Sequence, residues 1–389
     1  MRNASVDSLT GLIADLVRID SVNPSLDPDH AGEARIARFV AEWAEARGLT
    51  VEWLEGTPGR PSVVVTAKGS GGGANLLLNG HLDTVGVKGM DDPFHPNVHE
   101  GRMYGRGVFD MKASLAACLL TVAEASTLGL TGDVIFTAVA DEEEGSVGTE
   151  ETLAYLQHTG KPVAAAIVTE PSELQIQVAH RGFAVMEVGF EGKASHTAKP
   201  AAGVNALTHM GRLLHAVERQ AAHVNSGQPH PLLGHGSLLP VLAQGGQELY
   251  TTPASATLTL ERRTVPGESQ ELARAEINGL LTELTAADPS VKARVRTLLA
   301  REPFEVDTGS SIVRAVAEAA RAVTGAEAPL VGAPYWTDAA LVAAAGIPTV
   351  LYGPRGGGIH QSVEWVELDS VETVRQVLVR TARAICGAD

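Results

Sequence analysis

Apolar residues in the first 180 positions alternate between helical spacing and short uninterrupted runs. The helical spacing, with apolar positions three and four residues apart, predicts helices at 7–20, 31–47 and about 110–128. The runs predict strands at 51–54, 63–66, 76–79, 133–140 and 164–169. A near-continuous apolar run such as 133–140 suits a central strand that is buried on both faces. Together these elements predict an α/β fold, a mixed sheet with helices on both faces.

The pattern changes after about His180. Strands are predicted at 183–190, 257–263 and 291–297, and amphipathic helices at 203–224 and 268–284. This β-α-β-β-α-β-like order is typical of a ferredoxin-like α+β domain. The alternation of helices and buried strands seen before residue 180 then returns, with a helix at 310–324, a strand at 349–352 and a helix from about 369. We therefore expect a discontinuous main domain at 1–180 and 299–389, interrupted by an inserted domain at 181–298.

Composition narrows the class of protein. A chain of 389 residues is long for one core, and its net charge of -16 argues against nucleic acid as a partner. Cys118 and Cys386 are the only cysteines and have no metal-type spacing, which favours a reducing compartment. The N-terminal segment 1–7 lacks the apolar run of a signal peptide, and no stretch is apolar enough to span a membrane. We expect a cytoplasmic protein.

Five side chains that can bind metal follow predicted strands or glycine-rich turns: His81, Asp110, Glu143, Glu170 and His360. In open α/β sheets, functional residues gather at the carboxyl ends of the strands. Two imidazoles and three carboxylates suit zinc, with cobalt or manganese as substitutes. Two metal ions about 3.5–4 Å apart need a bridging carboxylate, and a shared site of this composition can supply one.

Two further carboxylates accompany these candidates. His81 and Asp83 are two residues apart in a strand and should face the same way. A carboxylate beside a histidine fixes which ring nitrogen faces a metal. Glu142 is left beside Glu143 and is our candidate for the general base that takes a proton from a metal-activated water.

Each segment has a plainer interpretation when it is taken alone. Residues 141–144 could be a solvated charge run, His360 a loop histidine, and Glu170 a carboxylate at a helix start. Their conjunction at strand ends favours a site. The glycines at 69–73 lack the Gly-Lys-Ser/Thr ending of a phosphate cradle. The Gly-x-Ser-x-Gly elbow of serine hydrolases and the His-Glu-x-x-His helix of zinc proteases are both absent.

Five segments together resemble the zinc amidohydrolase and metallopeptidase family of acetylornithine deacetylase, succinyl-diaminopimelate desuccinylase, aminoacylase and carboxypeptidase G. These segments are 80–85, 105–112, 141–146, 169–172 and the terminal His360. The resemblance implies one zinc ion on His81 and Glu170, a second on Glu143 and His360, and Asp110 as the bridge. It also implies that Asp83 orients His81, that Glu142 is the base, and that the Asp110–Met111 peptide bond is cis.

The inserted domain carries part of the resemblance. Segment 192–197 resembles a lid motif whose histidine, here His196, reaches the partner subunit's active site and stabilises the tetrahedral oxyanion. This implies a homodimer formed through the inserted lid domain. Segment 261–267 resembles a strand end that supplies an arginine, here Arg263, for the substrate's α-carboxylate. We expect Arg262 on the opposite strand face, at the surface.

Two details bear on the substrate. Tyr250 stands where relatives often carry asparagine, three residues before the proline that opens a strand, so the usual substrate-side contact is in question. Segment 336–338 resembles the pocket-side loop of deacetylase-like members.

The function implied is that of a co-catalytic di-zinc hydrolase that cuts an amide bond and releases a free amino acid. Within this class we favour an N-acyl-amino-acid deacylase, with a metallo-carboxypeptidase or dipeptidase acting on short peptides as the alternative. A catalytically silent relative that binds a ligand or holds an assembly is the alternative from another class. Its sequence signal would be the loss of Glu142 or of a ligand, whereas all seven positions are present.

Overall fold

A computed structural model of the chain describes residues 8–387. Segment 1–7, including the predicted start of the first helix, lies outside the described residues. The chain divides into two compact units. Among the described residues, the main unit comprises 8–178, 306–331 and 337–387, and the inserted unit comprises 179–305 and 332–336. The return to the main unit comes at 306 rather than 299, because the last strand of the inserted unit continues to Arg301.

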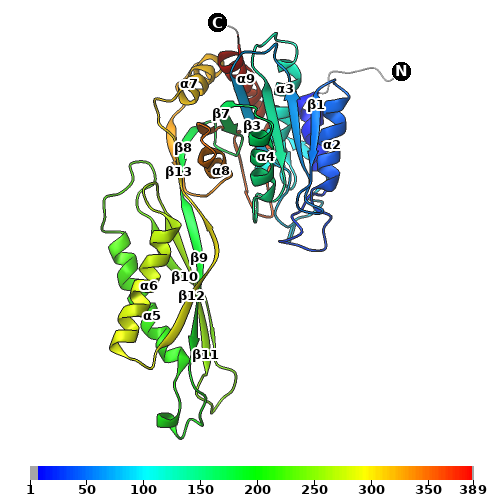
Figure 1. The fold of residues 1–389 in the computed structure, drawn as a ribbon. Helices are drawn as coiled ribbons and strands as arrows, with labels where there is room; N and C mark the ends of the chain where they lie inside the picture. Colours follow the sequence, from blue (N-terminus) through cyan, green and yellow to red (C-terminus); the bar gives the residue numbers. More distant parts are fainter. Residues whose placement is uncertain (1–7, 388–389) are drawn as a thin grey trace. The chain divides into compact units, whose positions relative to one another are not determined.

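The main unit is built on a mixed sheet (Figure 1). In spatial order its strands are β1 (Thr50–Leu54), β2 (Ser62–Ala67), β6 (Val134–Val139), β3 (Asn75–His81), β7 (Val163–Val168), β15 (Thr349–Leu351) and β8 (Ile176–His180). Strand β3 pairs in parallel with β6 and β7, and β15 is parallel to β7. The outer pairs are antiparallel, and two short strands, β14 (Leu330–Ala333) and β13 (Phe304–Glu305), pair with β8.

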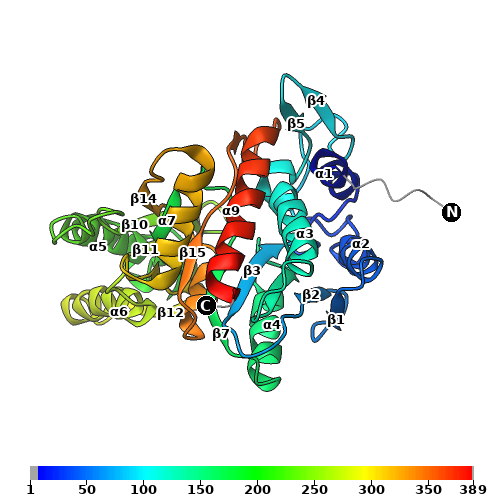
Figure 2. The same ribbon diagram turned by 90° about the horizontal axis from the view of Figure 1, so that it is seen from above.

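Helices cover both faces of this sheet, as the alternation of strands and helices predicts. One face packs against α1 (Leu9–Val17), α2 (Ala34–Glu45), α3 (Ala113–Ala125), α7 (Ser311–Thr324) and α9 (Leu368–Cys386). Figure 2 shows α3 and α9 side by side along it. Leu76, Leu78 and Phe136 point into this core, whereas Asn79 points the other way, toward Thr149. Helices α4 (Val147–His158) and α8 (Ala339–Ala344) lie on that opposite face.

A second, small antiparallel sheet in the main unit joins distant parts of the chain. Its strands, in order, are β16 (Gly356–Gly357), β17 (Trp365–Glu367), β5 (Arg102–Tyr104) and β4 (Asn97–His99). Trp365 pairs with Tyr104 and Glu367 with Arg102. This register places the segment that leads to Asp110 beside the segment that follows His360.

The inserted unit has the chain order β9-α5-β10-β11-α6-β12, which is the predicted ferredoxin-like arrangement. The strands form one antiparallel sheet in the order β10 (Ser237–Gly245), β11 (Ser255–Thr264), β9 (Gly182–Glu191) and β12 (Lys292–Arg301). Helices α5 (Ala206–Val224) and α6 (Gln270–Ala287) cover one face, and a short turn of 3-10 helix (Pro200–Ala202) precedes α5. Val188, Leu213, Leu258 and Ile277 meet in its core.

The prediction that Arg262 lies at the surface is wrong. Its side chain is 1% exposed, and its guanidinium donates to Glu276 Oε2 at 2.9 Å and to Glu268 Oε1 at 2.9 Å. Arg262 does take the strand face opposite to Arg263, but helix α6 covers that face and brings Glu276 with it. An arginine can be buried when carboxylates compensate its charge, as they do here.

Within residues 8–387, no helix is both long enough and apolar enough to cross a membrane.

Candidate metal centre

Three adjacent parallel strands end at the same edge of the main sheet. Strand β3 ends at His81, β6 ends shortly before Glu142 and Glu143, and β7 ends shortly before Glu170. Their carboxyl ends meet because parallel neighbours run in register. Asp110 arrives from the wide helical turn 108–112 that precedes α3, and the Asp110–Met111 peptide bond is cis, as expected.

The structure brings all five predicted ligands together as two triads that share Asp110. His81 Nε2 lies 3.0 Å from Asp110 Oδ1 and 3.6 Å from Glu170 Oε1. His360 Nε2 lies 3.3 Å from Asp110 Oδ2 and 3.1 Å from Glu143 Oε2. Within each triad the candidate ligand atoms lie within 4.8 Å of one another. We call His81, Asp110 and Glu170 the first triad, and Asp110, Glu143 and His360 the second triad.

The donor set fits divalent cations. His81 Nδ1 lies 2.9 Å from the carbonyl oxygen of Asp83, which fixes the ring N–H there and turns the lone pair of Nε2 toward the carboxylates. A lone pair that faces carboxylate oxygens is repelled unless a proton or a cation lies between them. Glu143 Oε1 is also buried without a hydrogen-bond partner. A cation in each triad would satisfy these atoms.

The ionisable groups of the triads are strongly perturbed. Hydrogen bonds to Asp110 and Glu143 raise the pKa of His360 to about 10. Although burial opposes it, the negative charges of Glu170 and Asp110 raise the pKa of His81 well above its usual range. Burial, together with the charge of Asp110, raises the pKa of Glu170. The cluster therefore holds protons tightly where cations would bind, and metal binding would release those protons.

Glu142 lies on the loop after β6 and directly precedes Glu143 of the second triad in the sequence. Its backbone N–H donates to Asp83 Oδ1 at 3.1 Å, and the Glu143 N–H donates to Asp83 Oδ2 at 3.2 Å. No hydrogen bond or ion pair holds the Glu142 carboxylate among residues 8–387. Burial, followed by the charge of Glu170, raises its pKa well above the usual range for a glutamate. A carboxylate of this kind is free to take up a proton.

Asp83 contacts His81 differently from the expectation. The nearest contact of His81 Nδ1 is the backbone carbonyl of Asp83, and the Asp83 carboxylate lies farther away, at 3.7 Å. That carboxylate instead fixes the backbone of residues 142 and 143 and accepts a hydrogen bond from Asn23 Nδ2 at 2.8 Å. Asp83 thus connects the first triad to the Glu142 loop.

Sequence reasoning missed the residues that support this loop. Asn23 Nδ2 also donates to Asp141 Oδ1 at 3.0 Å, and Arg60 donates to the same oxygen at 2.7 Å and to Glu33 at 2.6 Å. The only local signal was Asn23 before a proline, which marks a turn and not a site.

The two remaining predicted residues, His196 and Arg263, belong to the inserted unit. His196 is exposed and forms a β-bridge with Thr251, and its Nδ1 accepts from the Ala198 N–H at 3.1 Å. Arg263 lies at the end of β11, where its Nε donates to Glu261 and its guanidinium stacks 5.2 Å from the Phe183 ring centroid.

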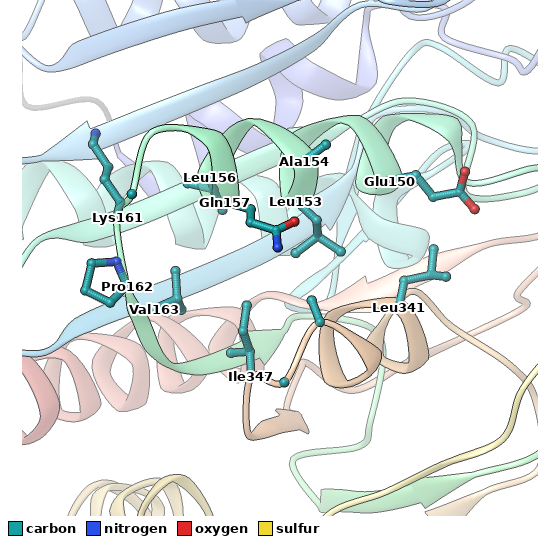
Figure 3. A pocket seen from close by; sticks show the side chains of 13 residues that line it. Glu150, Leu153, Ala154, Leu156, Gln157, Lys161, Pro162, Val163, Leu341 and Ile347 are labelled. Atoms are coloured by element: carbon teal, nitrogen blue, oxygen red, sulfur yellow. The ribbon is translucent and has the colours of Figure 1, made fainter.

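A groove of about 650 Å³ in the main unit lies between α4 and α8 (Figure 3). Its walls are mainly apolar, with Leu153, Leu341 and Ile347 facing one another and Glu150 and Lys161 toward opposite ends. None of the triad residues lines it, so this groove is separate from the candidate metal centre.

Comparison with known proteins gives matches over nearly the whole chain. A model of peptidase family M20/M25/M40 matches residues 77–384. The chain is 28% identical over 399 residues to acetylornithine deacetylase of Myxococcus xanthus, covering 98% of this chain and 99% of that protein. It is 27% identical over 382 residues to N-formyl-4-amino-5-aminomethyl-2-methylpyrimidine deformylase of Halalkalibacterium halodurans, covering 90% of this chain and 88% of that protein.

Solved structures share the fold at lower identity. A tripeptidase from Staphylococcus aureus superposes with a TM-score of 0.79 at 20% identity, covering 97% of this chain and 98% of its own. A dinuclear metal-binding peptidase of the M20 family from Bacillus subtilis superposes with a TM-score of 0.73 at 16% identity, covering 97% of each chain.

Proposed function

The chain belongs to peptidase family M20/M25/M40 and is a hydrolase of that family, and on this premise we propose that it is a dinuclear metallohydrolase that deacylates N-acyl amino acids. The observation that carries this proposal is the position of Asp110. Its two carboxylate oxygens face two different histidines, at 3.0 and 3.3 Å, and so join two triads at one point. That arrangement is what a bridging ligand between two metal ions requires.

The first triad would hold one ion and the second triad the other. Imidazole and carboxylate ligands in this number suit Zn²⁺, and Co²⁺ or Mn²⁺ can take the same ligands. When bound, such ions polarise the scissile carbonyl and acidify a water molecule.

Glu142 would carry the proton in the reaction. Its carboxylate takes the proton of the attacking water as the new C–O bond forms, and delivers it to the leaving nitrogen as the amide C–N bond breaks. The loop that carries Glu142 is fixed by the Asp83 carboxylate, while the Glu142 carboxylate itself is free among the described residues. His196 from a partner subunit would stabilise the oxyanion of the tetrahedral intermediate, a contribution often worth about 3–4 kcal/mol.

Arg263 would bind the α-carboxylate of the substrate. Its guanidinium is held by Glu261 on one edge and by the Phe183 ring on one face, which leaves the terminal nitrogens oriented. A pre-oriented guanidinium suits bidentate recognition of a carboxylate. The relatives named deacetylase and deformylase, which match over most of their length, favour deacylation over peptide cleavage. Cleavage of a C-terminal residue or a dipeptide would use the same anchor and is the alternative.

A substrate panel tests the function and the anchor together. We expect the metal-loaded enzyme to release free amine from acetyl-ornithine, succinyl-diaminopimelate or related N-acyl amino acids faster than from dipeptides. Arg263→Met should raise KM for the preferred substrate by about 10- to 100-fold, because a hydrogen-bonded charge pair contributes about 1.5–3 kcal/mol. Arg296→Met, which removes an exposed arginine of strand β12 in the same sheet, is the matched control.

An N-acyl amine without a carboxylate should be cleaved equally by the parent enzyme and by Arg263→Met. Cleavage of no member of the panel would refute the proposed activity. An equal loss on substrates with and without a carboxylate would refute the role of Arg263.

The proposal includes a homodimer formed through the inserted unit. Among the residues that the structure describes, strand β10 is an edge strand of its sheet and pairs only with β11. Leu239, Val241 and Leu242 on this strand are 55%, 47% and 63% exposed. An apolar edge strand of this kind is a surface on which another strand can pair.

Mixing two inactive variants tests the dimer. His196→Ala lacks the donated histidine and Glu142→Ala lacks the base, so each homodimer should be inactive. In a hybrid dimer one site has both residues. Random exchange at equal amounts should therefore restore roughly a quarter of the parent activity. If exchange is demonstrated with two different tags and no activity returns, His196 does not act across subunits.

A further inference from the structure

We propose that Glu364 and Arg106 form a buried clasp that positions Asp110 and His360, the shared ligand and the histidine of the second triad. The inference rests on the proposed metal function and assigns positioning residues that act through these ligands. Glu364 and Arg106 are nearly inaccessible, with side chains 1% and 3% exposed.

The Glu364 carboxylate binds the chain that leads into Asp110. Its Oε2 accepts from Arg106 Nη1 at 2.6 Å and from the Gly107 N–H at 3.0 Å. Its Oε1 accepts from the N–H groups of Phe109 at 2.9 Å and Asp110 at 3.1 Å. Both oxygens are therefore saturated by donors from residues 106–110, and the last donor is the backbone amide of the shared ligand itself.

Arg106 connects the same chain to the His360 turn. Its Nη2 donates to the carbonyl of Gln361 at 3.0 Å, directly after His360, and its Nε donates to the carbonyl of Gly86 at 3.1 Å. The backbone adds a hydrogen bond from the Gly105 N–H to the Glu364 carbonyl at 3.2 Å. The segments 105–110 and 360–364 are thus fixed to each other at both ends.

The backbone at Gly107 is in close contact with its surroundings on the side where a Cβ atom would lie. Gly107 has φ 73°, and a Cβ atom at this position would come within 2.5 Å of Thr84 Cγ2. A side chain there would displace the amide that donates to Glu364. The absence of a side chain at Gly107 is consistent with a chain held against that carboxylate.

The clasp holds two residues of the second triad, Asp110 and His360, but only Asp110 of the first triad. His81 and Glu170 come from the ends of β3 and β7, and His81 is oriented by the Asp83 carbonyl. Among residues 8–387, neither residue forms a hydrogen bond or an ion pair with Glu364 or Arg106. Loss of the clasp should therefore loosen the second triad and spare most of the first.

Metal titration of the chelator-stripped protein tests this inference, with Co²⁺ as the probe and calorimetry and visible absorption as readouts. Glu364→Gln keeps the size and shape of the side chain but replaces one accepting oxygen with an NH₂ group. This group faces the N–H donors of residues 106–110 and cannot accept from them. We expect the parent to bind two ions per chain. Glu364→Gln should lose about 10- to 100-fold in affinity at one site and less than about threefold at the other. Glu367→Gln is the matched control, because Glu367 lies on the same segment and, among the described residues, its side chain makes only a partly exposed ion pair with Arg102 at 3.6 Å.

A double variant shows which of the two metal sites Glu364→Gln weakens. His360→Ala should leave one ion bound, and adding Glu364→Gln to it should change that remaining affinity by less than about threefold. If Glu364→Gln does not fold by circular dichroism, Arg106→Lys, which keeps the charge but removes the forked donor to Gln361, replaces it in both comparisons.

The outcomes separate the two proposals. A parent protein that binds fewer than two ions would refute the dinuclear function, and the clasp with it. A parent that binds two ions, with both sites unchanged or equally weakened in the folded clasp variant, would refute the clasp alone.

Discussion

Glu142→Ala is expected to lower kcat by about 10³-fold while both metal ions stay bound, since general acid–base catalysis contributes roughly 10²–10⁴-fold. The reason is that two neighbouring glutamates on one loop have different proposed roles. Glu143, the proposed ligand, faces His360 at 3.1 Å, whereas the neighbouring Glu142 carboxylate has no partner among the described residues. Removing it should leave the ligand set intact and remove only the proton carrier.

Turnover of the preferred N-acyl amino acid and metal content by mass spectrometry are measured on the same sample. Glu144→Ala is the matched control, because Glu144 is the exposed acid on the same loop and should leave both quantities unchanged. Turnover of Glu142→Ala within about tenfold of the parent would contradict the assignment of the base, whose expected contribution is larger. Loss of metal would show that Glu142 is a ligand.

Asp110→Ala is expected to lower turnover by at least about 10³-fold and to remove metal from both triads. Metal polarisation contributes several kcal/mol to catalysis, and each 1.36 kcal/mol is a factor of ten in rate. Because each Asp110 oxygen faces a different histidine, one substitution should disable both sites.

Asp110→Asn tests whether each Asp110 oxygen serves one ion. The amide keeps one oxygen, so the variant should retain one ion and lose the other. Asp91→Ala removes an exposed acid and is the control for a change in charge alone. If Asp110→Ala bound two ions with parent affinity, Asp110 would not be a shared ligand.

The convergence of the strand-end candidate ligands could be predicted from sequence because two simple rules apply to them. Parallel strands end at one edge of a sheet, and His81, Glu143 and Glu170 each follow such a strand closely. Asp110 and His360 follow glycine-rich turns and not strands of the main sheet, so the strand rule does not apply to them and only the family resemblance implied their roles as bridge and second-ion ligand. The structure shows what joins them: the pairing of β5 with β17, which depends on residues more than 250 positions apart.

Other features could not be predicted because tertiary contacts decide them. Arg262 looked like a surface residue, since no local pattern reveals that Glu268 and Glu276 would surround it. Strand β10 was missed because Pro240 and a bulge between residues 240 and 242 break its alternation. Glu364 carries no motif of its own. Its importance appears only when four donors from 106–110 converge on it.

The central claim is that five residues far apart in the sequence bind two divalent ions around Asp110. Anomalous diffraction from crystals of the zinc-loaded protein tests it most directly. We expect two zinc peaks, one among His81, Asp110 and Glu170 and one among Asp110, Glu143 and His360, with a single carboxylate in contact with both. No peak, or zinc bound only elsewhere on the chain, would contradict the claim.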